Sequence, residues 1–135
     1  RLASDAYLPQ FNCLLEFDEV QHFTPQRMVT LDAMTDADQL GFNLESYRAL
    51  CRSHSAIAMQ KGAGGFRRPT SEFPFQGGRH AQRAFFDMMR DLLPPLHGLR
   101  PTIRISEFDL PSLLSDRHQV RIELEAKIGD CLDQR

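Results

Sequence analysis

The chain lacks any apolar run that approaches the ~20 residues a helix needs to cross a bilayer, so the sequence predicts no membrane span. It also lacks the basic start and apolar stretch of a secretory signal. Its three cysteines lie far apart with no CxxC pair. This pattern argues against a disulfide framework and a zinc knuckle, and it favours a reducing, cytoplasmic location. Lysine is scarce too: fourteen of the sixteen basic residues are arginine, whose planar group suits bidentate phosphate contacts.

The composition fits one globular domain covering residues 1–135. Hydrophobic residues make up 41% and charged residues 25%, close to ordinary folded proteins of this length. The net charge of −2 hides an asymmetry, since residues 1–47 have two bases against eight acids and residues 48–100 have nine bases against three. An acidic and a basic part suit a metal centre beside a polyanion-binding surface, although charge also fluctuates along chains with no such role.

Hydrophobic periodicity predicts an α/β chain in the order β-β-α-α-loop-α-β-α. A turn after Pro9 separates the first two strands, and the second strand is the apolar run at residues 13–17. The remaining elements are helices at residues 25–36, 43–60 and 79–93, a strand at residues 101–106, and a last helix capped by Ser115 or Asp116. The expected fold is a small mixed sheet flanked by helices.

The sharpest local feature is a group of acids around the end of the second expected strand. Alternation along a strand puts Glu16 and Asp18 on the same face, and a hairpin can bring Asp5 beside them. Such carboxylates repel one another unless a cation lies between them, and hard divalent cations such as Mg²⁺ prefer oxygen ligands. Gln21 and His22 follow and could hold a water, a phosphate or an acid. The alternative is a solvated strand end with no metal.

Residues 61–78 form a glycine-rich basic insertion, with five glycines and two prolines that break any regular element. With Arg79, the segment combines basic and aromatic side chains: Lys61, Arg67, Arg68 and Arg79 with Phe66, Phe73 and Phe75. Basic groups neutralise phosphates and exposed rings stack on bases. We therefore expect a nucleic-acid clamp in which Arg67 and Arg68 bind phosphates. In the alternative, Phe73 and Phe75 pack into the core beneath a plain surface loop.

Two parts of the chain resemble a known nuclease family. Asp5 followed by residues 14–23, Leu-Leu-Glu-Phe-Asp-Glu-Val-Gln-His-Phe, resembles the active-site hairpin of very-short-patch-repair-like endonucleases in the PD-(D/E)xK superfamily. That group has a Glu-x-Asp-Gly-x-x-His signature, with Gln commonly before the His. Downstream, residues 82–85, 99–105 and 107–110 resemble the family's later helix, last core strand and following turn. The two matches touch about a third of the chain.

The resemblance implies a restriction-endonuclease-like core and a Mg²⁺- or Mn²⁺-dependent endonuclease that hydrolyses phosphodiester bonds of DNA. The implied metal ligands are Asp5, Glu16 and Asp18, and the implied catalytic residues are these three with Gln21 and His22. Gln21 or His22 would position water or the leaving group. Arg27 and Arg83 would contact phosphate, and the alternative for Arg83 is a surface pair with Asp87 one helical turn away.

Departures from the family pattern leave other interpretations open. Glu19 stands where the family has Gly, and Asp18 occupies the place of the superfamily's lysine, whose role is unfilled or passes to Gln21. These departures favour a non-catalytic descendant of the fold that binds nucleic acid or a protein partner, and a homodimer is also open. A pI near 6.2 favours a structural domain with no nucleic-acid role. The family's first helix should precede Asp5, and a start at Arg1 fits a core without it.

Overall fold

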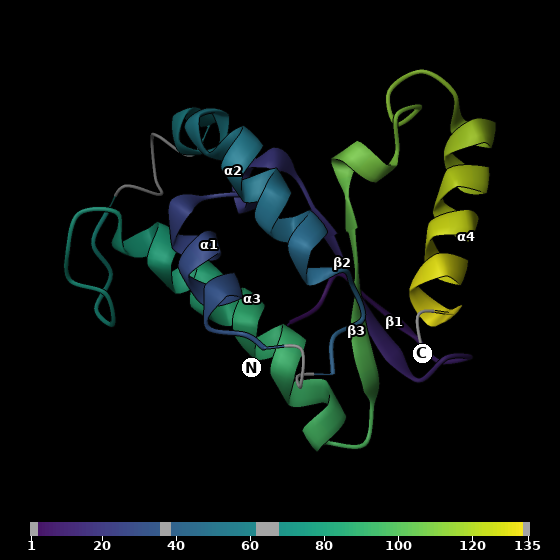
Figure 1. Cartoon of the computed structure of the whole chain (residues 1–135), viewed down its shortest axis with the longest axis horizontal. Helices are drawn as coiled ribbons and strands as arrows, with labels where there is room; N and C mark the ends of the chain where they lie inside the picture. Colours follow the sequence, from purple (N-terminus) through teal and green to yellow (C-terminus); the bar gives the residue numbers. More distant parts are fainter. Residues whose placement is uncertain (1–2, 36–38, 62–67, 134–135) are drawn as a thin grey trace.

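The computed structural model of the chain describes residues 3–35, 39–61 and 68–133. Its elements are β1 (Ala6–Leu8), β2 (Cys13–Asp18), η1 (Val20–His22), α1 (Pro25–Asp32), α2 (Leu44–Lys61), α3 (Gly78–Leu96), β3 (Arg100–Ser106), η2 (Glu107–Asp109) and α4 (Arg117–Asp133), where η1 and η2 are short 3₁₀ turns. The predicted order and the α/β class with a small mixed sheet are confirmed (Figure 1). The restriction-endonuclease-like core stays a prediction. No helix within the described residues is long and apolar enough to cross a membrane.

β2 is the middle strand of the three-stranded sheet. It runs antiparallel to β1, with Ala6 opposite Leu15, and parallel to β3, with Glu16 opposite Arg104. The hairpin between β1 and β2 turns at Asn12, whose φ of 50° lies in the left-handed region that asparagine tolerates better than most residues. Because β2 and β3 are parallel, their carboxyl ends lie at the same edge of the sheet, and η1 and η2 begin there.

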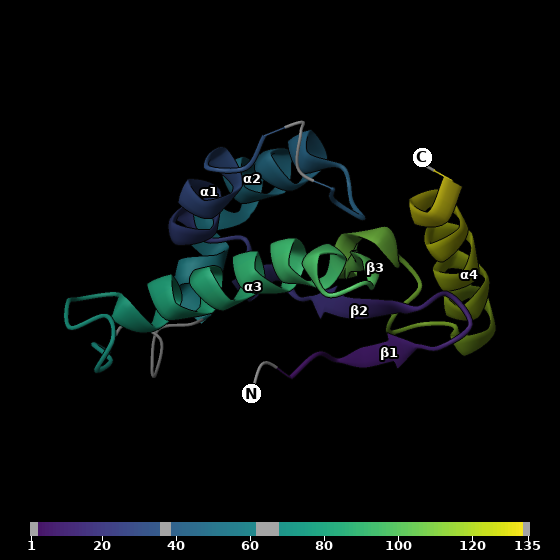
Figure 2. The same ribbon diagram turned by 90° about the horizontal axis from the view of Figure 1, so that it is seen from below.

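The sheet separates two layers of helices (Figures 1 and 2). α3 lies against one face with α1 and α2 beside it, and α4 covers the other face. The α4 side is apolar, with the buried residues Cys13, Ile103, Ile105, Leu110 and Cys131 packed against Val120, Leu124, Ile128 and Leu132. Because side chains alternate along a strand, Glu16 and Asp18 of β2 and Arg104 of β3 point to the opposite side. The face under α3 is therefore charged although it is buried.

A second apolar core holds α1 against α2. It consists of Phe23, Leu31, Met34, Phe42, Tyr47 and Cys51. The start of α1 is as predicted, since Thr24 Oγ1 accepts a hydrogen bond of 3.1 Å from the Arg27 amide and Pro25 occupies the first helical position. The helix ends at Asp32, short of the predicted residue 36. Phe23 of this core directly follows η1, which carries His22.

α3 continues through two prolines that were expected to end it. It runs to Leu96 with Pro94 and Pro95 in its last turn. Pro94 has no amide hydrogen, so it cannot bond the Arg90 carbonyl one turn earlier. Thr102 on β3 donates a hydrogen bond of 2.6 Å to that carbonyl instead. The prediction of a helix ending at residue 93 was wrong because a neighbouring strand satisfies the group that proline leaves unpaired.

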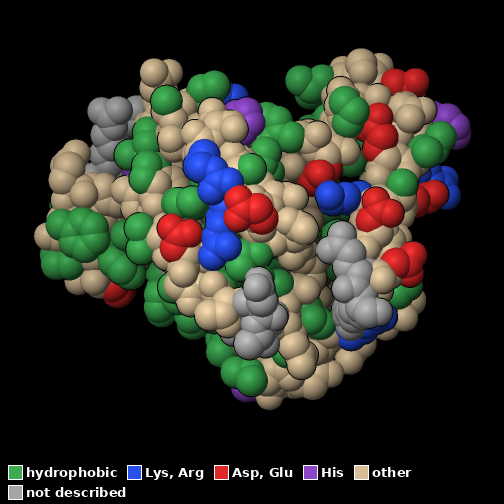
Figure 3. Space-filling view, in the orientation of Figure 1, with side chains coloured by type: hydrophobic (Ala, Val, Ile, Leu, Met, Phe, Trp, Pro, Cys, Tyr) green, Lys and Arg blue, Asp and Glu red, His purple; other side chains and the backbone are tan. Residues whose placement is uncertain are grey.

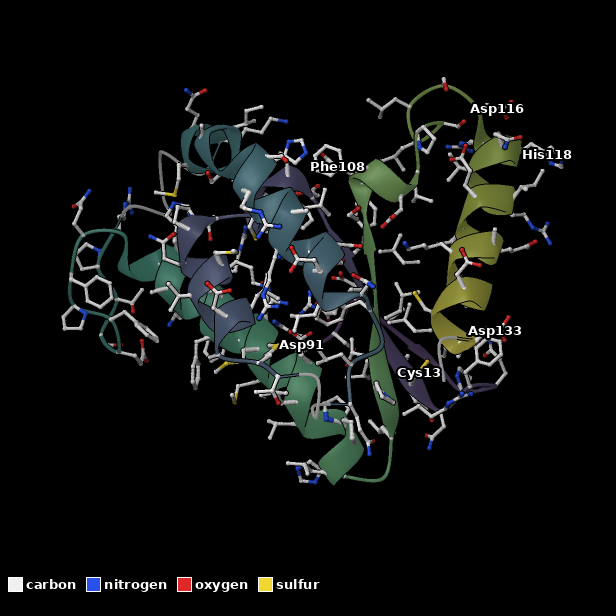
Figure 4. The ribbon with its side chains drawn as sticks, in the orientation of Figure 1. Cys13, Asp91, Phe108, Asp116, His118 and Asp133 are labelled. Atoms are coloured by element: carbon white, nitrogen blue, oxygen red, sulfur yellow. The ribbon has the colours of Figure 1, made fainter. Side chains whose placement is uncertain are left out.

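Two isoleucines that belong to the apolar pattern of their helices lie at the surface. Ile57 on α2 is 48% exposed and Ile122 on α4 is 46% exposed. Ile122 lies only two residues from Val120, which faces the core, and a spacing of two places side chains on different helix faces. The predicted cap of α4 is present: Asp116 Oδ1 accepts hydrogen bonds from the backbone amides of His118 (2.9 Å) and Gln119 (3.1 Å) (Figure 4).

Candidate metal and phosphate site

A cavity of about 570 Å³ opens where the β1–β2 hairpin faces α3. Its strand-side wall is largely acidic and polar, and it includes Asp5, Glu16, Glu19, Gln21 and His22. Its helical wall includes Arg79, Arg83, Phe86, Asp87 and Arg90. The cavity therefore places carboxylates opposite guanidinium groups, an arrangement suited to a cation and an anion bound side by side.

The helical wall follows from the spacing of residues along α3. Arg79, Arg83, Phe86 and Arg90 are separated by four, three and four positions, so they lie along one face of the helix. The sequence placed Arg83 among the expected phosphate contacts and Arg79 in the expected clamp, but neither Phe86 nor Arg90 was expected at the site. Helical spacing was the available signal for both residues, because they continue the face of Arg79 and Arg83 by two turns.

Asp5, the residue just before β1, lies beside Glu16 of β2. The Asp5 amide donates to Glu16 Oε1 at 3.3 Å, and Asp5 Oδ2 accepts from the Phe17 amide at 2.8 Å. The antiparallel register that pairs Ala6 with Leu15 sets this proximity. Each carboxylate thus uses one oxygen for a backbone amide. Neither Asp5 Oδ1 nor Glu16 Oε2 has a hydrogen bond to a described residue.

Glu16 is only 5% exposed, and burial raises its pKa to about 7. The positive charges of Arg104 and Arg90 lower this pKa, and the negative charges of Asp5 and Asp18 raise it. The Arg90 Nε atom lies 3.5 Å from Glu16 Oε1 and donates to the Ala3 carbonyl at 2.7 Å. Arg90 thereby ties the segment before β1 to α3, next to Glu16.

Asp18 does not line the cavity. It points to the same side of the sheet as Glu16, as predicted, but both its oxygens face Arg104 Nη1 at 2.8 and 2.9 Å. The Tyr47 hydroxyl also donates to Asp18 Oδ2 at 2.9 Å. Asp18 therefore lies apart from the cavity that Asp5 and Glu16 line, and its role as a ligand of the same ion stays a prediction. Strand alternation predicted a metal ion beside Asp18. The structure has the positive charge of Arg104 there.

Arg104 lies at the centre of a buried charge cluster. It is 1% exposed, and its Nε atom bonds Asp91 Oδ1 at 2.5 Å while Nη2 donates to the Asp87 carbonyl at 3.1 Å. Arg27 Nη2 bonds the other Asp91 oxygen at 2.7 Å, and Figure 4 marks Asp91 on α3. Arg27 is 2% exposed. It therefore holds α1 to α3, and its predicted contact with a phosphate does not fit this burial.

His22 connects the buried cluster to the cavity. Its Nδ1 atom lies 3.1 Å from Asp87 Oδ2 and 3.2 Å from Asp18 Oδ1, and its ring also lines the cavity. Burial works to raise the pKa of Asp87, but the charge of Arg104 and the hydrogen bond with His22 outweigh it and hold that pKa below its usual range. An anionic Asp87 favours a hydrogen on the His22 Nδ1 atom. Nε2 is then the ring nitrogen left for a substrate.

Within the described part of the chain, two sets of side chains could hold a divalent cation. The first set is Asp18, His22 and Asp87. Each offers one ligand atom, and these three atoms lie within 4.8 Å of one another. However, Asp18 is paired with Arg104, and Asp87 Oδ1 lies 3.3 Å from Arg90 Nη1. The Asp5 and Glu16 pair fits better, since both residues line the cavity and each keeps one oxygen without a hydrogen bond to a described residue. Mg²⁺ is commonly held by one or two carboxylates, waters and a substrate phosphate.

The remaining predicted residues divide by location. Arg83 lines the cavity, and burial lowers the pKa of its guanidinium. The Gln21 side chain donates to the Glu19 carboxylate beside it. Arg68 is exposed, and its carbonyl accepts from the Arg79 amide at 2.9 Å, which holds the end of the insertion against the start of α3. Arg67 and Phe66 lie outside the described residues, so the part of the clamp that depends on them stays a prediction.

Comparison with known proteins places the chain in a family but leaves its activity open. Residues 2–125 match a family of unknown function, DUF7255. The chain belongs to this family. The DUF7255 match covers the hairpin, the cavity and the charge cluster, and it names no nuclease. No curated protein and no solved structure matches the chain.

Proposed function

We propose that this DUF7255 chain is a Mg²⁺-dependent nuclease domain that hydrolyses phosphodiester bonds of DNA. The observation that carries the proposal is the pair of neighbouring carboxylates, Asp5 and Glu16, opposite the arginines of α3. The order of elements supports it as well. The segments that resemble the nuclease hairpin, later helix and last strand are β1–β2, α3 and β3, and all of them meet at the cavity or pack beside it.

Five residues that line the cavity have a role in this proposal. Asp5 and Glu16 hold the cation, which when bound polarises a phosphoryl oxygen and lowers the pKa of an attacking water. Arg79 and Arg83 bind the phosphate oxygens, as planar guanidinium groups do well. His22 positions the attacking water or the leaving oxygen through Nε2, because Asp87 and Asp18 hold its ring through Nδ1.

Metal titration tests the carboxylate pair directly. Mn²⁺ binding to the metal-free protein is followed by electron paramagnetic resonance, and cleavage of plasmid DNA is measured in parallel. We expect Asp5→Asn and Glu16→Gln to lose both Mn²⁺ binding and cleavage while circular dichroism stays unchanged. Glu19→Gln is the matched control, since Glu19 lines the same cavity but lies outside the pair. A Glu16→Gln protein that cuts DNA at the wild-type rate would remove Glu16 from the mechanism.

The surroundings of Glu16 favour a second candidate, a DNA-binding domain without catalysis. Arg90 lies beside Glu16, and the raised pKa of Glu16 lets a proton neutralise it near pH 7. Both features reduce the need for a metal. This candidate predicts DNA binding that is insensitive to Mn²⁺ and to Glu16→Gln, with no cleavage under any condition. The Mn²⁺ titration described above therefore separates the two candidates.

A further inference from the structure

A run of four phenylalanine rings leads from the surface into the cavity. Phe75 lies edge-on to Phe73 with ring centroids 6.2 Å apart, Phe73 lies 6.1 Å from Phe85, and Phe85 lies 5.9 Å from Phe86. Phe86 is part of the cavity wall. Phe75 is 51% exposed and Phe85 is 39% exposed. Hydrophobic side chains gather over this end of the molecule in Figure 3, at the left of the view.

The expectation that Phe73 and Phe75 simply pack into the core does not account for this arrangement. Phe73 is partly buried, but its ring contacts are with Phe75 and Phe85, which are themselves exposed. None of these rings belongs to either apolar core of the described residues. Exposed aromatic rings that gather in one place mark a binding surface more often than isolated ones do.

The charges around the rings indicate the kind of partner. Arg79 and Arg83 line the cavity beside Phe86, and Arg68 is exposed on the segment that leads to Phe73. The nearby acid Glu72 accepts a hydrogen bond of 3.0 Å from Gln82. Arginines beside open aromatic faces fit a polyanion that carries flat rings. Nucleic acid has this chemistry, since its phosphates pair with arginine and its bases stack on phenylalanine.

We propose that Phe73, Phe75 and Phe85 form a stacking surface for unpaired bases, and that the cavity acts on single-stranded or locally unpaired DNA. Bases inside a duplex are already stacked on both faces, so these rings could not reach them without unstacking. Phe86 joins the stacking surface to the cavity, and the strand's phosphates lie along Arg79 and Arg83. The choice of substrate rests on the proposed nuclease function, whereas base stacking is tested by binding alone.

The test compares three labelled DNA ligands by fluorescence anisotropy in EDTA, where no metal-dependent cleavage occurs. The ligands are a short oligothymidylate, an abasic strand of equal length, and a duplex of equal length. We expect oligothymidylate to bind most tightly. Phe75→Ala and Phe85→Ala should each weaken its binding at least about fivefold, the lower end of one base–ring stack, and should leave abasic binding unchanged. Phe108→Ala is the control, since Phe108, labelled in Figure 4, is 41% exposed and its ring contacts are with His54 and Phe23 instead.

Three results would overturn the stacking surface: equal binding of oligothymidylate and abasic strand, tighter binding of the duplex, or unchanged affinity in both phenylalanine variants. Phe85→Leu serves if an alanine variant unfolds, because leucine keeps apolar bulk but lacks the ring face. A change of oligomeric state in the variants, without a change of affinity, would assign the rings to self-association instead. If Mn²⁺ binding fails while base-dependent binding persists, the nuclease function falls and the stacking surface stands. If Mn²⁺ still binds but DNA affinity does not depend on the bases, the stacking surface falls and the nuclease function stands.

Discussion

Arg104 on β3 holds both carboxylate oxygens of Asp18 on β2, at 2.8 and 2.9 Å, inside the layer between the sheet and α3. The contact explains why two acids on the same strand face have different environments. Asp18 is neutralised by a buried guanidinium, whereas Glu16 reaches the cavity with its pKa raised to about 7. The chain therefore separates a structural carboxylate from one available to a ligand by only two positions.

The raised pKa of Glu16 predicts a pH-dependent stability in the absence of metal. The folded protein binds the Glu16 proton more tightly than the unfolded chain, whose pKa is near 4.5, so Glu16 favours folding at low pH and loses that effect as pH rises through 7. We expect Glu16→Gln to raise the free energy of unfolding by about 1–3 kcal/mol at pH 8.5 and to change it little at pH 5. Urea denaturation in EDTA at the two pH values measures this. The same difference at both values would contradict it.

Removing the buried guanidinium should be costly. Arg104→Met leaves Asp18, Asp87 and Asp91 without their shared cation, and we expect a loss of about 3–5 kcal/mol in the free energy of unfolding. The control is Arg121→Met, which breaks the Arg121–Glu125 pair on the surface of α4 and should cost less than about 1 kcal/mol. Chemical denaturation compares the two variants. Similar losses would show that the cluster contributes no more than a surface pair.

The end of α3 should depend on Thr102 only because Pro94 is present. Thr102→Val removes the hydrogen bond to the Arg90 carbonyl, and leaving that group unpaired should cost about 1–3 kcal/mol. In Pro94→Ala, the new backbone amide can bond the same carbonyl. We therefore expect a smaller cost of Thr102→Val in the Pro94→Ala background. A double-mutant cycle measures this coupling, and additive effects would argue against it.

Phosphate contacts by α3 should appear in the salt dependence of DNA binding. Arg83→Ala should lower the slope of log affinity against log salt by up to ~0.7 for a single strand, with a smaller change if its contact is partial. Arg27→Ala should instead unfold the protein in part, because Arg27 is buried against Asp91. Anisotropy at several salt concentrations gives the slope, and thermal unfolding separates the two variants. An unchanged slope for Arg83→Ala would remove it from the phosphate-binding set.

Local pattern predicted the elements well and the charge cluster poorly. The alternation along β2 and the cap at Thr24 each depend on a few neighbouring residues, so they are readable in the sequence. The same pattern gave the common face of Glu16 and Asp18. It could not show that Arg104, 86 positions from Asp18, would reach it first. Only the packing of β3 on β2 decides that contact.

The site residues on α3 were also hard to predict from the sequence. Arg90 looked like one of many surface arginines, and its contact with Ala3 spans 87 positions. Asp87 and Asp91 on α3 fit the pattern of an ordinary charged helix face until β3 is placed beneath them. An arginine inside the otherwise apolar stretch around Ile103 and Ile105 was the available signal, because a buried charge requires a partner of opposite sign.

The parallel pairing of β2 with β3 has a consequence for how the chain folds. β2 is complete at Asp18, but its partner begins at Arg100, after three helices have been made. Joining such distant segments requires closing a long loop, which slows folding. During synthesis on a ribosome, the apolar face of β2 and its unpaired edge wait for β3 to emerge. A nascent chain that ends before Arg100 therefore leaves this apolar face uncovered, and exposed apolar surface of this kind favours aggregation.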